Sequence, residues 1–213
     1  MKMKKIKLKK KNLSNKSFRW LDRHLNDEFV LKSKAEGFRS RSSYKLIEIN
    51  KKYNIFHQSK TILDLGCSPG GWLQVAKKLS SKNTKILGID ILQIKEIEGV
   101  KFLKKDIFDE DIFTLIQQNF SAKIDLMMSD MSPNSSGNKS VDHLRIISLV
   151  ERVIEISRTL LNPGGILVSK IFQGGAQGEL IKTMNKDLTQ IRYFKPKSSR
   201  KESPETYLIA KKN

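Results

Sequence analysis

The sequence predicts an α/β fold built on a mostly parallel β-sheet that is covered by helices on both faces. From residue 60 onward, short apolar runs alternate with stretches of helical periodicity, which is typical of strand–helix–strand units. The apolar runs are nearly continuous, as expected for strands buried on both faces. The last two strand-like runs have no helical segment between them, so we expect an antiparallel end to the sheet.

The expected strands span residues 61–66, 85–91, 100–106, 123–130, 165–172, 190–195 and 205–212. Expected helices alternate with the strands at residues 71–81, 111–120, 141–161 and 178–188. Asn162, Pro163, Gly164 and Gly165 are expected to stop the third of these helices. Ahead of the first strand, apolar residues recur at spacings of three or four within residues 17–36, and a basic turn leads into a second helix within residues 37–53.

Charge is the unusual feature of the composition. The 213 residues contain 41 Lys and Arg against 22 Asp and Glu, a net charge of +19. Such an excess favours a polyanionic partner, with nucleic acid first and an anionic membrane surface second. An AT-biased genome is a further explanation for part of the lysine content. Residues 1–16 contain eight lysines and no acid, so we expect a disordered basic tail followed by a single domain over residues 17–213.

Cysteine and histidine usage limits the possible chemistry. Cys67 is the single cysteine, which excludes an internal disulfide and fits a reducing, cytoplasmic environment. The three histidines are scattered without ligand spacing, so no metal site is expected. No apolar run approaches the length of a membrane span, and we expect no membrane partner.

The sharpest local motif is DLGCSPGGW, residues 64–72, between an expected strand and an expected helix. Its glycines, Gly66, Gly70 and Gly71, allow a ligand to approach the backbone at the switch point of a doubly wound sheet. The motif lacks the lysine of a phosphate-binding Walker loop and the GxGxxG spacing of a dinucleotide loop. The third possibility is a loop that binds S-adenosyl-L-methionine. Asp64, just before the loop, suits a ligand that carries an amino group and a positive charge.

Four consecutive expected strands end in or near an aspartate: Asp64, Asp90, Asp106 and Asp130. Asp90 follows the glycine loop at about the sequence separation expected for a carboxylate that binds ribose hydroxyls. Asp106 could accept a hydrogen bond from an adenine amino group. The alternative is that each is a turn former or helix cap. Likewise, Trp72 can simply pack beneath the sheet, and Cys67 is better explained as a small core residue than as a nucleophile.

Lys170 lies within GGILVSKIFQGG, residues 164–175, in the middle of an expected buried strand. A buried lysine is unfavourable unless it is paired. One explanation is that it lies at the strand end and reaches solvent; the other is that it reacts. If the strands that end at Asp130 and Lys170 are neighbours, both side chains face one crevice at the carboxyl edge of the sheet.

Five stretches carry a resemblance to a known family: RSRSSYKL (39–46), DLGCSPGGW, SDMSPNSSG (129–137), SKIFQGG (169–175) and SSRKESPETY (198–207). In this order, over about residues 36–210, they resemble the FtsJ-type RNA ribose 2′-O-methyltransferases. The resemblance implies a Rossmann-like, S-adenosylmethionine-dependent methyltransferase fold with a seven-stranded sheet. It is strongest to the bacterial enzymes that act on large-subunit 23S ribosomal RNA.

The resemblance also implies a Lys–Asp–Lys–Glu tetrad made of Lys45, Asp130, Lys170 and Glu205. It carries the cofactor contacts over to Gly70, Trp72, Asp90, Asp106 and Asp130, in addition to Asp64, Gly66 and Gly71 from the loop itself. This sequence departs from the family pattern in three places: Ser68 replaces the usual alanine, GGAQGEL follows Lys170, and Pro204 directly precedes Glu205.

The implied reaction is 2′-O-methylation of a ribose, expected to be a uridine, with S-adenosyl-L-methionine as donor and no metal. Lys170 would steer the hydroxyl oxygen and accept its proton. The expected partner is ribosomal RNA in the assembled large subunit, and the expected enzyme is a cytoplasmic monomer. A basic rim of Arg39, Arg41, Lys197 and Arg200 is expected to follow RNA phosphates. Methylation of tRNA, a non-catalytic role in ribosome assembly and a nicotinamide oxidoreductase are the alternatives.

Overall fold

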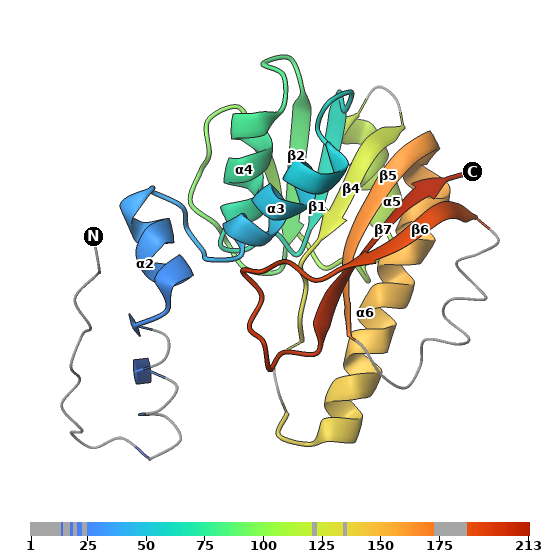
Figure 1. Cartoon of the computed structure of the whole chain (residues 1–213). Helices are drawn as coiled ribbons and strands as arrows, with labels where there is room; N and C mark the ends of the chain where they lie inside the picture. The colour runs from blue at the N-terminus through green and yellow to red at the C-terminus, as the bar shows by residue number, and fades with distance from the viewer. Residues whose placement is uncertain are drawn as a thin grey trace.

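A computed structural model describes residues 14, 18, 21–22, 25–120, 123–133, 136–172 and 187–213, excepting the side chains of residues 139 and 143. These residues form one seven-stranded sheet in the order β3-β2-β1-β4-β5-β7-β6 (Figure 1). The strands are β1 (Thr61–Leu65), β2 (Lys85–Asp90), β3 (Lys101–Lys104), β4 (Ile124–Ser129), β5 (Leu161–Phe172), β6 (Leu188–Phe194) and β7 (Glu205–Lys212). The helices are α2 (Glu28–Ala35), α3 (Ser43–Tyr53), α4 (Gly71–Leu79), α5 (Ile112–Asn119) and α6 (Lys139–Leu160).

Strand directions agree with the expected mostly parallel sheet. β1 is flanked by β2 and β4, and the pairs β1–β2, β2–β3, β1–β4 and β4–β5 are all parallel. The last strand in the chain, β7, inserts between β5 and β6 and runs antiparallel to both. The predicted antiparallel end is therefore confirmed, and it places the end of the chain beside β5.

Helices cover both faces of the sheet (Figure 1). On one face, α3 and α4 bury Leu46, Ile49 and Leu73 against the strands. On the other, α5 and α6 bury side chains such as Ile116 and Val153. Full burial of each such side chain contributes roughly 1.5–3 kcal/mol relative to leaving it exposed. Two apolar layers thus hold the sheet between them, and the carboxyl ends of the parallel strands remain at one edge.

Three expectations about element bounds need correction. The apolar spacing within residues 17–36 does not give one continuous helix, because Asn26 is in a turn and Asp27 caps α2 by accepting from the backbone N–H groups of Phe29 and Val30. Helix α6 ends at Leu160, just before residues 162–165 as expected, but the following strand starts earlier than residue 165. Residues 162–165 already belong to β5, where Leu161 pairs with Ile124 and the register shifts before Ile166.

The expected helix at 178–188 lies outside the described residues except for its last two positions. There Leu188 begins β6 and pairs with Lys212 instead of continuing a helix. The expected basic tail, residues 1–16, also lies outside the described residues apart from Ser14. In the part of the chain that is described, none of the helices combines the length and the apolar character needed to cross a membrane.

Candidate active site

Strand register brings Asp130 and Lys170 together. β4 and β5 are parallel neighbours with Ser129 opposite Ser169, so the next residue of each chain, Asp130 and Lys170, lies at the same carboxyl edge. The Lys170 ammonium nitrogen Nζ is 2.6 Å from the Asp130 carbonyl oxygen and 3.2 Å from Asp130 Oδ1. Lys170 is only 8% exposed. The lysine is therefore buried and paired, and it does not reach out to solvent.

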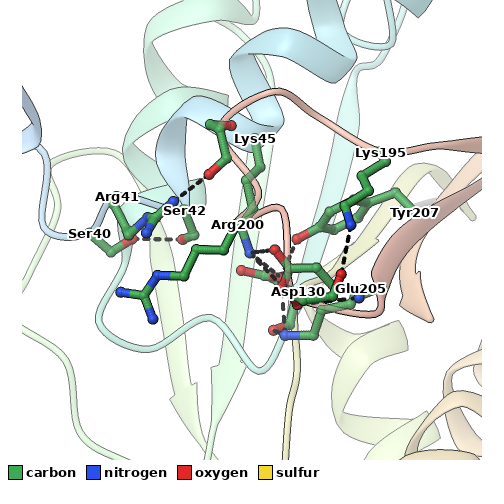
Figure 2. A network of polar contacts seen from close by, with 12 residues as sticks. Ser40, Arg41, Ser42, Lys45, Asp130, Lys195, Arg200, Glu205 and Tyr207 are labelled. Carbon is green, nitrogen blue, oxygen red and sulfur yellow. Dashed lines mark hydrogen bonds and ion pairs between the residues drawn. The ribbon is translucent and has the colours of Figure 1, made fainter. Parts of the chain in front are cut away.

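The other two predicted members of the tetrad reach the same point from distant elements (Figure 2). Lys45 lies in the first turn of α3, and its Nζ is 2.8 Å and 2.9 Å from the two carboxylate oxygens of Glu205. The same Nζ is 3.9 Å from Asp130 Oδ1. Glu205 is the first residue of β7, directly after Pro204. The structure thus gathers all four predicted side chains into one alternating cluster of two cations and two anions.

Tyr207 is a further member of this cluster to which the sequence interpretation gave no role. Its hydroxyl donates to Asp130 Oδ1 at 2.6 Å, and its ring is fully buried, 5.7 Å from the ring of Trp72. Tyr207 is directly opposite Lys170 in the β5–β7 pair, which places both side chains on the same face. The sequence held a signal for it, because Tyr207 is two residues after Glu205 and alternate residues of a strand share a face.

The surroundings of Asp130 favour its ionised form. Burial would raise the pKa of the Asp130 carboxyl, but the adjacent Lys170 and Lys45 outweigh burial. Hydrogen bonds from Tyr207 and Lys170 act in the same direction, and the pKa stays below its ordinary value. Asp130 is therefore a carboxylate at neutral pH and can orient the lysine beside it. Tyr207 shows the converse effect: burial, with Asp130 and Glu205 nearby, raises its pKa well above the usual value, so it remains a hydrogen-bond donor.

A cavity of about 570 Å³ opens beside this cluster at the carboxyl ends of β1, β2 and β4. Of the residues predicted to bind the cofactor, Gly66, Asp90, Asp106 and Asp130 line it. Asp90 accepts from the backbone N–H groups of Ser68 and Leu92, both at 2.8 Å, and so fixes its carboxylate between the glycine loop and the loop after β2. Apolar walls come from Ile89, Ile91, Leu92, Ile107, Phe108, Met131, Pro133 and Leu149.

The donor set of this cavity fits S-adenosylmethionine. A pocket with apolar walls and a few placed polar groups is typical of a small-molecule site. Acids along its lining suit hydroxyl, amino and sulfonium groups rather than phosphates. Asp64 Oδ2, beneath the loop, is buried and has no hydrogen-bond partner among the described residues. Burial and the nearby Asp130 and Asp90 raise the pKa of Asp64 well above its ordinary value.

The remaining predicted cofactor residues do not line the cavity, and their contact with a cofactor stays a prediction. Asp64 lies within β1 and is 1% exposed. Gly70 has a φ of +104°, and a side chain there would meet Arg39. A side chain at Gly71 would collide with Ser40 and Ser43. Trp72 donates its indole N–H to the Ser42 carbonyl at 3.0 Å. These residues pack the start of α4 closely against the segment that carries Lys45.

The four residues expected to bind RNA occupy two environments. Arg39 donates to the carbonyls of Pro69, Lys95 and Glu96, so it ties the glycine loop to the loop after β2. Arg41 forms an ion pair with Asp27 and donates to the Ser198 carbonyl. Arg200 Nη2 is 3.6 Å from the same Asp27 carboxylate, and Lys197 is exposed. Lys197 and Arg200 therefore lie on the segment that Arg41 contacts through the Ser198 carbonyl, and Arg39 contacts other loops.

Helix α3 holds this segment, residues 195–204, in place. One turn after Lys45, Glu48 accepts from the backbone N–H groups of Lys197 and Ser198 at 2.7 Å and 2.9 Å. Lys195 Nζ donates to the carbonyls of Lys201 and Ser203 within the segment. The same helix thus fixes one end of the segment through Glu48 and the other end, at Glu205, through Lys45.

Together, the doubly wound sheet, the ligand cavity at its carboxyl edge and the buried Lys–Asp pair define an α/β enzyme of the cofactor-dependent kind. Within the described residues, no three His, Cys, Asp or Glu side chains are grouped so that they could hold a metal ion.

Comparison with known proteins identifies the family. A model of the FtsJ-like methyltransferases matches residues 38–213, and this chain belongs to that family. It is 46% identical over 207 residues to a protein of Rickettsia akari named ribosomal RNA large subunit methyltransferase E, covering 95% of this chain and 90% of the relative. The protein of the same name from Rickettsia bellii is 44% identical with the same coverage.

A solved structure is also similar. It is a protein of Plasmodium falciparum provisionally named a ribosomal RNA methyltransferase, with a TM-score of 0.73 and 32% identity over 82% of this chain and 98% of that one. The expected methyltransferase fold is thereby confirmed, and the nicotinamide oxidoreductase alternative is excluded.

Proposed function

We propose that this enzyme transfers a methyl group from S-adenosyl-L-methionine to the 2′-hydroxyl of a uridine ribose in large-subunit 23S ribosomal RNA. The relatives named as large-subunit ribosomal RNA methyltransferases support the substrate, and the net charge of +19 suits an RNA partner. The target is ribosomal RNA within the assembled subunit, and the enzyme acts as a monomer in the cytoplasm, in a single domain after a basic tail.

One observation carries the mechanism: the two hydrogen bonds between Lys170 and Asp130. A neutral amine has two N–H groups and one lone pair. When both N–H groups are donated to the two oxygens of Asp130, the lone pair is the position left for a substrate hydroxyl. Asp130 thus orients Lys170 as the acceptor of the 2′-hydroxyl proton, a role of general-base catalysis.

The other members of the cluster set this orientation. Tyr207 fixes Asp130 Oδ1, so the carboxylate cannot rotate away from Lys170. Lys45 and Glu205 form an ion pair at 2.8 Å, which holds both side chains beside Asp130. Much of the rate acceleration comes from holding hydroxyl and methyl group in line.

When bound, the cofactor supplies a methyl group on a positively charged sulfur. Asp90 and Asp106 are placed in the cavity to hold its polar groups, with Asp90 on ribose hydroxyls and Asp106 on the adenine amino group. Asp130 lines the same cavity and is a member of the tetrad. It therefore connects the cofactor site to Lys170, the proposed general base.

Methyl transfer to defined RNAs tests the proposal. Purified enzyme is given radiolabelled S-adenosylmethionine with either large ribosomal subunits from cells that lack the modification, protein-free ribosomal RNA from the same cells, or bulk tRNA. Label in subunits, recovered in an alkali-resistant dinucleotide, is the expected result. Label only in tRNA would support the proposed methyl transfer but show that tRNA is the substrate. Cofactor binding without transfer to any of the three RNAs would favour the non-catalytic alternative.

A further inference from the structure

Two of the arginines on the expected RNA rim share one carboxylate. Asp27, the residue that caps α2, forms an ion pair with Arg41 and lies 3.6 Å from Arg200 Nη2. Arg41 precedes the tetrad residue Lys45 by four positions, and Arg200 precedes Glu205 by five. Both arginines are drawn in the same close-up as Lys45, Asp130 and Glu205 (Figure 2). A carboxylate held between two guanidinium groups has the arrangement in which proteins bind a phosphate.

Polar groups of Arg41 and of the segment that carries Arg200 are incompletely satisfied. Arg41 Nε, Ser198 Oγ, Ser199 Oγ and Arg200 Nε are buried and have no hydrogen-bond partner among the described residues. Ser198 is completely buried and Ser199 is 6% exposed. Buried polar atoms are nearly always paired in native proteins. Four such atoms, on Arg41 and on three consecutive residues, are therefore left for a further hydrogen-bonding group.

Asp27 is not needed to attach α2 to the rest of the protein. Phe29 packs against Tyr44 with ring centroids 5.4 Å apart, and Val30 is buried in the same region. Gln74 of α4 bonds to the backbone of Gly37 and Arg39, just after α2. These contacts hold the helix by packing and backbone hydrogen bonds, so they remain in place when the carboxylate is not between the two arginines.

We propose that Arg41, Arg200, Ser198 and Ser199 form a binding site for a backbone phosphate of the substrate RNA, and that Asp27 occupies this site in the free enzyme. The proposal rests on RNA being the substrate. An incoming backbone phosphate presents two non-bridging oxygens, as a carboxylate does, and it replaces Asp27 between the guanidinium groups. Asp27 competes with every RNA to the same extent. RNA that makes no other specific contact therefore binds more weakly to this highly basic protein. RNA that gains additional contacts at the tetrad overcomes the competition.

Charge removal at Asp27 tests this competition. Asp27→Asn keeps a side-chain oxygen that can cap α2 and removes the negative charge. Its matched control is Glu28→Gln, which makes the same change of net charge at the adjacent, exposed residue of α2. The probe is a fluorescein-labelled 12-nucleotide oligouridylate, and the readout is its Kd at fixed salt by fluorescence anisotropy. Thermal denaturation and S-adenosylmethionine binding confirm that both variants are folded.

We expect Asp27→Asn to lower the Kd about fivefold, because a partly buried ion pair no longer has to be broken, and Glu28→Gln to change it less than twofold. Adding Arg200→Gln to Asp27→Asn should abolish the gain. Weaker RNA binding by Asp27→Asn, or a change no larger than that of the control, would overturn the proposal, since it would make Asp27 a support for the arginines. The result is independent of methyl transfer, so failure of the proposed reaction would be seen separately in the wild-type assay.

Discussion

Replacing Tyr207 by phenylalanine removes one hydroxyl group and leaves the ring that packs against Trp72. The hydroxyl donates to the ionised Asp130 at 2.6 Å, and a hydrogen bond to a charged group contributes about 1.5–3 kcal/mol to stability. We therefore expect the free energy of unfolding to fall by about 2 kcal/mol. For a protein of this size, this corresponds to a decrease in Tm of roughly 4–8 °C.

The same substitution should reduce kcat more than it changes KM. Asp130 loses the group that fixes Oδ1, so Lys170 is oriented less well, and we expect kcat to fall about tenfold, equivalent to about 1.4 kcal/mol in the barrier. The assays are thermal denaturation and methyl transfer to large ribosomal subunits. The control is Tyr193→Phe, which deletes the same hydroxyl at a half-exposed tyrosine of β6. An unchanged Tm and kcat in Tyr207→Phe would refute the idea that the hydroxyl positions Asp130.

Two further predictions concern buried titratable groups. The pKa of Asp64 is higher in the folded than in the unfolded protein. Its contribution to folding stability is therefore fully present below the unfolded-state pKa and is lost as pH rises through the folded-state pKa. Asp64→Asn should therefore stabilise the cofactor-free protein, with a gain of about 1 kcal/mol or more in urea unfolding that grows between pH 4 and pH 7; a gain independent of pH would contradict this. Burial also raises the pKa of the Cys67 thiol, so iodoacetamide at pH 8 should label Cys67 only after denaturation, and rapid labelling of the native protein would disprove it.

The carboxyl edge of the sheet could be predicted from the sequence because it follows from local patterns. Buried apolar runs locate parallel strands, and parallel strands place their following residues at one edge. This was enough to bring Asp130 beside Lys170. The roles of Lys45 and Glu205 were expected only from the family resemblance, since neither lies in a pattern that distinguishes it from other surface charges.

Other features could not be predicted because they depend on contacts between distant segments. Asn162 to Gly165 have turn-forming residue types, and they form an irregularity within β5, because Leu161 and Ile166 on either side of them pair with β4. The apolar spacing that suggested a single helix over 17–36 is interrupted because Asp27 caps α2 and binds Arg41. The interaction of Asp27 with Arg200 joins residues 173 positions apart. Hydrophobic periodicity along the sequence cannot predict a contact between such distant residues.

The central claim is that Lys170 accepts the proton of the ribose hydroxyl, and its removal is the most direct test. Lys170→Met keeps the length of the side chain and removes the amine, while Lys101→Met makes the same change at an exposed lysine of β3. The measurement is the single-turnover rate of label transfer into an alkali-resistant dinucleotide of ribosomal RNA, with S-adenosylmethionine binding measured in parallel. We predict a rate about 10²- to 10⁴-fold lower for Lys170→Met, with cofactor binding retained and the control unchanged. A rate within threefold of wild type would contradict the account, because the buried lysine would then have no part in the reaction.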